Sequence, residues 1–244
     1  MNKIIKLFGI LNVTPDSFSD GGEFINPVKA IEQVKKLFED GADFIDVGGQ
    51  STRPGANEIT PEEEWGRVEP VLQEIISDQI SLDTKHPDTA QKFLDLGGRV
   101  LNDVSGFQNQ RMREMAPQFA MIIINHFPGE TVEEVHEQKI CSINQVKDEL
   151  LARKEELIKS GVDSDNIVLD PGIGFGKTME LNRELLRFAE LVPQEKIMIG
   201  YSRKRFLGEH RLEIEPNLDA AKVAINAGTK FLRIHDVREH KNLI

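Results

Sequence analysis

Short apolar stretches alternate along the chain with longer stretches in which apolar and polar residues follow a helical period. The apolar stretches are rich in Ile, Val, Leu and Phe. They predict eight buried strands at about residues 4–11, 43–47, 79–83, 99–103, 119–125, 166–170, 196–200 and 230–235. Segments with helical periodicity lie between them, at 27–41, 61–76, 86–97, 143–161, 181–192 and 216–228. Strands that are apolar throughout and alternate with helices predict a parallel sheet whose outer face is covered by helices.

Glycine and proline mark the expected ends of these helices. A glycine follows the last periodic residue of four of them, where a left-handed residue commonly ends a helix: Gly41, Gly97, Gly161 and Gly228. A proline stands at or near three expected first turns, where its missing N–H costs nothing: Pro27, Pro61 and Pro87. The boundaries therefore agree with the periodicity.

Eight strand–helix units within 244 residues favour a closed (β/α)8 barrel, the TIM barrel of the α/β class, over an open doubly wound sheet. An open nucleotide-binding sheet would carry a Gly-rich fingerprint after its first strand, and the sequence has none there. No Ser/Pro-rich or charged linker interrupts the chain, so we expect residues 1–244 to form a single domain. Only residues 238–244 remain for the last helix, which we expect to be short.

The composition excludes several classes of protein. With 39% hydrophobic and 29% charged residues, it is that of an ordinary globular protein. A net charge of −11 argues against nucleic acid or an anionic membrane as a partner, because both would repel the chain. The single cysteine, Cys141, allows no internal disulfide. The apolar start is too short for a signal peptide and lacks a cleavage site, so we expect a cytoplasmic protein.

Polar residues stand at the carboxyl end of every expected strand, where the catalytic groups of a barrel lie. They are Asn12, Asp46, Asp83, Asn102, Asp103, His126, Asp170, Ser202, Lys204, Arg233 and His235. Two or three of them could simply mark turns, since Asp and Asn favour such positions. A complete ring that includes Arg and His in the otherwise apolar stretch 231–237 indicates a functional site.

The charges of this ring are divided between its two sides. Carboxylates and amides follow the third, fourth and sixth strands, and they suit a flat heterocycle with N–H donors, such as an aminopyrimidinone. Cations follow the seventh and eighth strands, which form the usual phosphate site of this fold. The residues therefore predict a ligand with a polar ring at one end and phosphate at the other.

Three loops border the ring. Residues 14–26 and 48–60 form two long loops that could close over a ligand, and Arg53 in the second is a candidate anion contact. The Gly-rich loop 170–178 lacks the spacing of a phosphate loop, and we expect it to present Phe175 to an aromatic ligand. In the segment 200–208, Ser202 is placed to cap a short helix.

Seven segments, in order along the chain, resemble the successive motifs of the dihydropteroate synthase family. They are residues 9–22, 46–56, 81–90, 101–107, 170–178, 201–204 and 233–237, of which NVTPDSFSDGG and DPGIGFGKT are the specific signals. The resemblance implies a transferase of folate biosynthesis that condenses 6-hydroxymethyl-7,8-dihydropterin pyrophosphate with 4-aminobenzoate. The products would be 7,8-dihydropteroate and pyrophosphate, formed in an SN1-like displacement assisted by Mg²⁺. It further implies a homodimer that is a target of sulfonamides.

The resemblance also assigns roles to residues at the matching positions. The pterin ring would be held by Asp83, Asn102, Asp170, Lys204 and Phe175. The pyrophosphate would contact Asn12, Thr52, Arg53, Arg233 and His235, and Asn12 would also bind the Mg²⁺. The 4-aminobenzoate pocket would comprise Phe18, Thr52, Pro54, Phe175, Lys204 and Arg205. Mobile loops would contain Asp16, Phe18, Asp20 and Arg53, and the catalytic set would be Asp83, Lys204, Arg233 and His235.

Three features depart from the family pattern. Asn125 stands where a methionine is expected to pack on the pterin, so pterin affinity or orientation could differ. Arg205 replaces a serine that would contact the aminobenzoate carboxylate, and we expect it to alter sulfonamide sensitivity. The final helix is short for a dimer contact. Two alternatives remain: a corrinoid-linked pterin methyltransferase, which would need no Mg²⁺, and a non-catalytic pterin-binding protein. A purely structural barrel would leave the polar ring unexplained.

Overall fold

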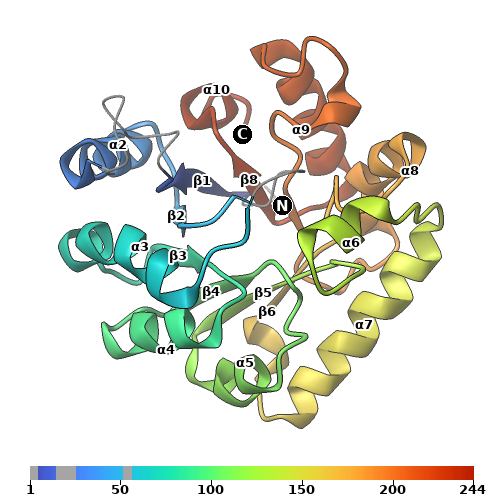
Figure 1. The fold of residues 1–244 in the computed structure, drawn as a ribbon. Helices are drawn as coiled ribbons and strands as arrows, with labels where there is room; N and C mark the ends of the chain where they lie inside the picture. The colour runs from blue at the N-terminus through green and yellow to red at the C-terminus, as the bar shows by residue number, and fades with distance from the viewer. Residues whose placement is uncertain (1–4, 15–25, 52–56) are drawn as a thin grey trace.

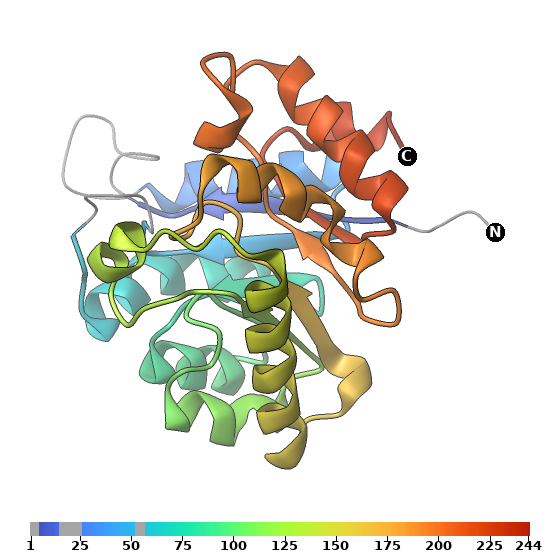
Figure 2. The same ribbon diagram turned by 90° about the vertical axis from the view of Figure 1, so that its right-hand side faces the viewer.

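The computed structural model describes residues 5–14, 26–51 and 57–244 of the 244-residue chain. At its centre lies an eight-stranded sheet with the strand order β6-β5-β4-β3-β2-β1-β8-β7, in which every pairing is parallel. A parallel bridge between Leu169 and Ile197 brings the two ends of the sheet together. Helices surround the strands (Figures 1 and 2). The prediction of a (β/α)8 barrel is confirmed.

The strands lie where the apolar stretches predicted them. They are β1 Lys6–Asn12, β2 Phe44–Gly48, β3 Ile80–Asp83, β4 Val100–Asp103, β5 Met121–Asn125, β6 Ile167–Asp170, β7 Met198–Ile199 and β8 Phe231–Ile234. Strand β7 is the shortest, and β6 meets it through the isolated bridge between Leu169 and Ile197.

Most of the outer helices also match the periodicity. The five that match directly are α2 Pro27–Glu39, α3 Pro61–Ile75, α4 Pro87–Asp95, α7 Ile143–Lys159 and α9 Ile214–Ala227. The stretch expected as one helix at 181–192 is divided into α8 Met179–Glu184 and the 3-10 segment η3 Leu185–Glu190. Two helices were not predicted, α5 Gln110–Met115 and α6 Val132–Glu137, because six residues are too few to establish a period. The last helix, α10 Val237–Lys241, is short, as expected.

Helix ends follow the predicted chemistry. Helix α9 ends at Gly228, whose φ of 102° is the left-handed conformation that glycine adopts without strain. The three other glycines expected at helix ends also have positive φ. Three helices begin with proline, and Thr60 caps α3 by accepting a hydrogen bond from the N–H of Glu63 at 3.2 Å. Among the described residues, no helix is long and apolar enough to cross a membrane.

The interior of the barrel is filled by a layer of apolar side chains. The layer comprises Phe8, Val100, Ile123, Val168, Met198 and Phe231, with Phe44 and Met121 packed against it. The ring of Phe8 is fully buried, stacks on Phe44 at 4.5 Å and meets the edge of Phe231 at 5.7 Å. Strand residues of the opposite parity, such as Leu7 and Leu232, belong to the larger core between strands and helices.

We expect Phe8→Ala to destabilise the barrel, because the ring contacts both neighbouring strands and its loss would leave a cavity. The free energy of unfolding, measured by urea denaturation, should fall by about 3–5 kcal/mol. Leu212→Ala is the control, since the Leu212 side chain is 68% exposed; it should change stability by less than about 0.5 kcal/mol. Equal losses in the two variants would contradict a central role for the Phe8 layer.

Candidate functional site

A layer of polar side chains lies next to the apolar interior, toward the carboxyl ends of the strands. Side chains on a strand alternate between the two faces, so a residue two positions beyond an inner residue points into the same space. Five polar residues stand two positions beyond members of the apolar layer: Asp46, Asn102, Asn125, Asp170 and Arg233. The hydrogen bonds described below show that most of them also touch one another. The carboxyl ends of the strands thus form one polar surface.

Asp46 lies at the centre of this polar layer and is fully buried. Its carboxylate accepts hydrogen bonds from Arg233 Nε at 2.5 Å, Ser81 Oγ at 2.6 Å and Asn102 Nδ2 at 2.9 Å. Asp46 was expected from the sequence to belong to the polar ring, without a particular role. The signal that could have found it is its position two residues beyond Phe44, which turns the carboxylate into the barrel.

Arg233 joins Asp46 to Asp83. Its Nη2 donates to Asp83 Oδ2 at 2.6 Å, and only about a fifth of its side chain is exposed. Burial opposes the charge of Arg233, but the carboxylates of Asp46 and Asp83 outweigh it and raise the pKa of the guanidinium. Burial also raises the pKa of Asp83, while Arg233 works to lower it. Arg233 was expected at the anionic end of the ligand, yet two of its three nitrogen atoms are bonded to carboxylates here.

Lys204 and Asp170 form a second charged group beside Asp46, Arg233 and Asp83. Asp170 Oδ1 accepts a hydrogen bond from the Gly172 N–H at 2.7 Å, and Lys204 Nζ donates to the Ile173 carbonyl at 2.5 Å. Burial lowers the pKa of Lys204 to about 8, against the opposing effect of Asp170. Burial raises the pKa of Asp170, and Lys204 opposes that shift. The ammonium also lies 5.1 Å from the centroid of the Phe175 ring, so the cation and the aromatic face are adjacent.

Lys177 fixes the loop that carries Phe175. Its Nζ donates to the carbonyl oxygens of Gly172 and Phe175, each at 2.9 Å, and of His126 at 3.1 Å. Three donors thus meet three acceptors, which satisfies the charged form even though burial lowers the pKa of Lys177. Gly172 permits this approach: its φ is 64°, and a Cβ there would lie 2.2 Å from the His126 oxygen. Lys177 lies within the DPGIGFGKT motif, but no role was expected for it from the sequence.

Ser202 orients His235 and does not cap a helix. Ser202 Oγ lies 2.9 Å from His235 Nδ1 and accepts from the His235 N–H at 3.2 Å. The expected cap is wrong, because the 3-10 turn η4 Arg205–Leu207 begins after Lys204 and no side chain caps it. The Arg203 side chain pairs with Asp236 at 2.6 Å.

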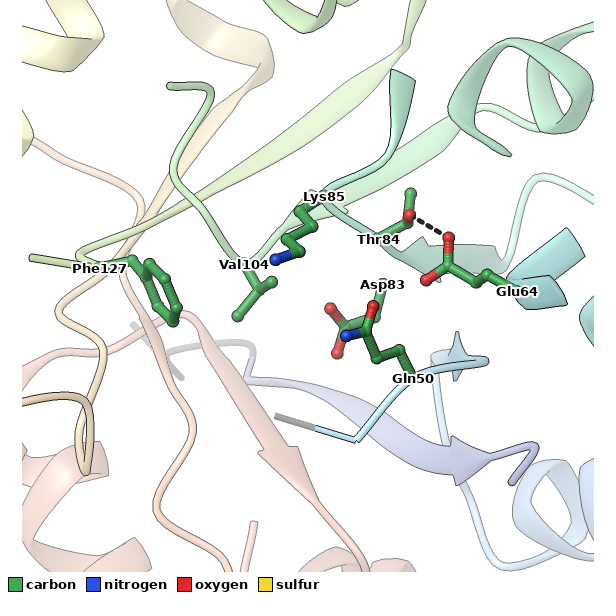
Figure 3. Close-up of a pocket in the computed structure, with 7 residues that line it drawn as sticks. All are labelled: Gln50, Glu64, Asp83, Thr84, Lys85, Val104 and Phe127. Carbon is green, nitrogen blue, oxygen red and sulfur yellow. Dashed lines mark hydrogen bonds between the residues drawn. The ribbon is translucent and has the colours of Figure 1, made fainter. Parts of the chain in front are cut away.

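A small pocket opens beside the polar layer (Figure 3). It is lined by Gln50, Glu64, Asp83, Thr84, Lys85, Val104 and Phe127. The Asp83 and Gln50 side chains overlap in the middle of the view, and Val104 and Phe127 lie to their left. Glu64 is buried and accepts from Thr84 Oγ1 at 2.6 Å; burial raises the pKa of its carboxyl. Asp83 therefore lines a pocket that contains both polar and apolar side chains.

The end of β1 brings a carboxamide close to Asp83. A Cβ built on Gly48 would lie 3.9 Å from Asn12 Oδ1 and 3.8 Å from Asp83 Oδ2, so both oxygens lie close to Gly48. Hard oxygen atoms are the protein ligands that Mg²⁺ prefers, and one or two of them commonly act together with substrate phosphates. Within the described ranges, no group of three or more His, Cys, Asp or Glu residues could hold a metal by itself. Asn12 therefore fits a metal site that a phosphate-bearing substrate completes.

The structure brings most of the expected site residues together. Asn102 and Arg233 both bond to Asp46, and Arg233 also bonds to Asp83. Lys204 neighbours Asp170 and Phe175, and His235 lies beside Ser202. Arg205 is exposed at the start of η4. Other expected site residues lie outside the described residues, namely Asp16, Phe18, Asp20, Thr52, Arg53 and Pro54.

A family model described as pterin binding enzyme matches residues 8–235. The match spans every strand end described above, from Asn12 to His235. The chain belongs to the pterin binding enzyme family.

Relatives within that family share one name. A dihydropteroate synthase of Neisseria meningitidis serogroup C is 38% identical over 249 residues, which cover 96% of this chain and 88% of that protein. This chain therefore groups with the dihydropteroate synthases and is a transferase.

Solved structures agree with this grouping. The dihydropteroate synthase of Clostridium difficile, in the presence of pteroic acid, has a TM-score of 0.86 at 36% identity and covers 98% of this chain and 94% of its own. The Xanthomonas albilineans enzyme with 4-aminobenzoic acid has a TM-score of 0.85 at 31% identity, with coverages of 98% and 90%. The Yersinia pestis enzyme in a sulfonamide complex has a TM-score of 0.87 at 29% identity, with coverages of 98% and 91%.

We expect Lys177→Met to loosen the loop that carries Phe175, because three carbonyl oxygens would lose their donor. The free energy of unfolding should fall by about 1–3 kcal/mol, measured by urea denaturation. Lys222→Met is the matched control, since Lys222 is exposed and its ion pair within the described ranges is with the exposed Asp219. If the two variants were equally stable, the three contacts of Lys177 would contribute nothing measurable.

Proposed function

We propose that this protein condenses 6-hydroxymethyl-7,8-dihydropterin pyrophosphate with 4-aminobenzoate to give 7,8-dihydropteroate and pyrophosphate, in folate biosynthesis in the cytoplasm. The observation that carries the proposal is the polar layer, in which carboxylates and amides lie beside a lysine and an aromatic ring. This combination suits a flat heterocycle with N–H donors. The names of the relatives support the same substrates.

The heterocycle would lie on the polar layer. Asp83 and Asp170 would accept hydrogen bonds from its N–H groups, and Asn102 would both donate and accept. Lys204 would donate to the ring oxygen and nitrogen from one side. Phe175, which already lies against the Lys204 ammonium, would border the ring.

The pyrophosphate would lie toward the ends of β1 and β8. In the described part of the chain, Arg233 bonds to Asp46 and Asp83 through Nε and Nη2, and its Nη1 would donate to such an anion. His235 is oriented by Ser202. Thr52 and Arg53, outside the described residues, would add contacts from the second loop. Bound Mg²⁺, held by Asn12 and the substrate phosphates, would supply positive charge to the leaving group.

The displacement would be SN1-like. The bond between the pterin methylene and the pyrophosphate oxygen breaks, and its electron pair leaves with the pyrophosphate, which Arg233 and His235 stabilise. The electron-rich pterin spreads the resulting cation, and Asp83 is the nearest carboxylate to balance it. The amine of 4-aminobenzoate then forms the new C–N bond and releases a proton. It is unprotonated at neutral pH, so the site needs to position it more than to deprotonate it.

The 4-aminobenzoate pocket would be built around Phe175, Lys204 and Arg205, together with Phe18, Thr52 and Pro54, which lie outside the described residues. Arg205 directly follows Lys204 and is exposed, so its guanidinium could pair with the substrate carboxylate. The Xanthomonas enzyme was solved with 4-aminobenzoic acid and the Yersinia enzyme with a sulfonamide, which supports a site in this family for each kind of ligand. We propose that this protein is also a sulfonamide target.

We further propose a homodimer formed through the late helices. Exposed apolar side chains gather on elements near the end of the chain: Met179 on α8, Leu191 directly after η3, and Val223 on α9. Helix α9 packs against η3, so these elements form one side of the barrel. Apolar groups on a neighbouring set of helices support a contact with a second copy.

The test is pyrophosphate release from 6-hydroxymethyl-7,8-dihydropterin pyrophosphate, with and without 4-aminobenzoate and Mg²⁺, with the pterin product identified by mass. We expect 7,8-dihydropteroate only when both are present, and its loss in Lys204→Met. Lys222→Met should retain full activity. A protein that binds the pterin but forms no product would be a non-catalytic binding protein, and turnover without Mg²⁺ would contradict the role of Asn12.

We expect the contribution of Lys204 to pterin binding to depend on pH. Its pKa is about 8, so the ammonium is charged below that value and loses its proton as the pH rises through it. The affinity of the wild-type protein for 6-hydroxymethylpterin, relative to that of Lys204→Met, should therefore be greatest below pH 8. It should decline by up to about tenfold per pH unit above pH 8. Isothermal titration calorimetry at several pH values measures this ratio, in which the ionisation of the ligand cancels. A ratio independent of pH would show that the charge of Lys204 does not hold the ring.

A further inference from the structure

Asn125 is a buried amide at the end of β5, with 8% of its surface exposed. It stands two residues beyond Ile123 of the inner apolar layer and pairs in register with Asp170 on β6. Its Nδ2 donates to Asn102 Oδ1 at 2.8 Å and approaches the Asp103 carbonyl at 3.4 Å. The side chain of Asn125 is therefore directed toward β4 and toward Asn102.

The amide of Asn102 is held from both sides. On one side its Nδ2 donates to Asp46, which as a carboxylate can only accept. On the other side its Oδ1 accepts from Asn125, whose Nδ2 can only donate. A rotation of the Asn102 amide by 180° would place oxygen against the carboxylate and nitrogen against the Asn125 amide nitrogen. The Asn125 amide is itself oriented by the Asp103 carbonyl, which only accepts and lies 3.4 Å from Nδ2. Both neighbours therefore select the same orientation of Asn102.

This orientation fixes what Asn102 can offer to a ligand. A primary amide has two N–H donors and two lone pairs on its oxygen. One donor is used by Asp46 and one lone pair by Asn125. Among the described contacts, one donor and one acceptor of the Asn102 amide remain, and their positions on the polar layer are fixed. A heterocycle that binds there must present the complementary pair.

We propose that Asn125 is a positioning residue of the heterocycle site and fixes the amide of Asn102 in the orientation that binds the ring. The inference rests on the proposed function, since it takes the pterin as the ligand of Asn102. An apolar side chain of similar size would fill the same space but leave Asn102 Oδ1 without its donor. The orientation of the amide would then be determined from the Asp46 side alone, and binding the ring would have to restrict it further.

Two variants with the same number of side-chain heavy atoms as asparagine test the proposal. Asn125→Leu removes the donor, and Asn125→Asp replaces it with oxygen atoms that repel Asn102 Oδ1. We expect the Kd for 6-hydroxymethylpterin, measured by calorimetry, to rise roughly five- to twenty-fold in Asn125→Leu and further in Asn125→Asp. The KM for 4-aminobenzoate should stay within about twofold, because that substrate is not expected to contact Asn102.

The control is Thr229→Val, which removes a buried hydrogen bond to the Ile197 carbonyl at the opposite end of the barrel. It should lower stability without changing the Kd for the pterin. This control separates a general loss of stability from a local change in the site. A Kd in Asn125→Leu equal to that of the wild-type protein would overturn the proposal.

A measurement without ligand separates the inference from the proposed function. The side-chain amide of Asn102, observed by NMR after ¹⁵N-asparagine labelling, should give sharp, slowly exchanging signals in the wild-type protein. These signals should broaden in Asn125→Leu but not in Thr229→Val. If they do so while the wild-type protein fails to bind 6-hydroxymethylpterin, the positioning role holds and the proposed function is wrong. If they are unchanged in Asn125→Leu, Asn125 does not fix the amide.

Discussion

The fully buried carboxylate of Asp46 accepts hydrogen bonds from three other strands of the barrel. Ser81 belongs to β3, Asn102 to β4 and Arg233 to β8, so one carboxylate on β2 links four strands. A buried carboxylate without partners would be costly, and three donors offset that cost. Because the donors must meet at one point, their side chains have little freedom left. The polar surface of the site is thereby organised before any ligand binds.

The second constraint on the site is the burial of two lysines at the loop after β6. Lys204 and Lys177 both donate to carbonyl oxygens of the loop after β6, and burial lowers the pKa of each. The contacts of Lys177 satisfy it within the protein, whereas Lys204 lies beside Asp170 and Phe175 and can turn toward a ligand. Lys177 therefore holds the loop through three contacts, whereas Lys204 holds it through one and borders the polar surface.

Much of the barrel could be predicted from local patterns. Each apolar stretch became a strand, because a parallel strand covered on both faces has no polar side to show. Glycines such as Gly228 ended helices as expected. The short helices α5 and α6 were missed, since six residues contain too little periodicity. The cap expected from Ser202 was wrong, because the hydroxyl found a partner in His235, which is 33 residues away in the sequence.

By itself, the sequence determined the order of strands and helices, the polar residue at each strand end and the motifs of the family. These features are local, because they depend on periodicity and on residue types at fixed spacing. Only the tertiary structure decided that Arg233 would pair with Asp46 and Asp83, 187 and 150 residues away, and that Asn125 would bond to Asn102. Such contacts depend on the closure of the barrel, which brings the ends of distant strands to one surface. No local pattern encodes which of the side chains gathered there will meet.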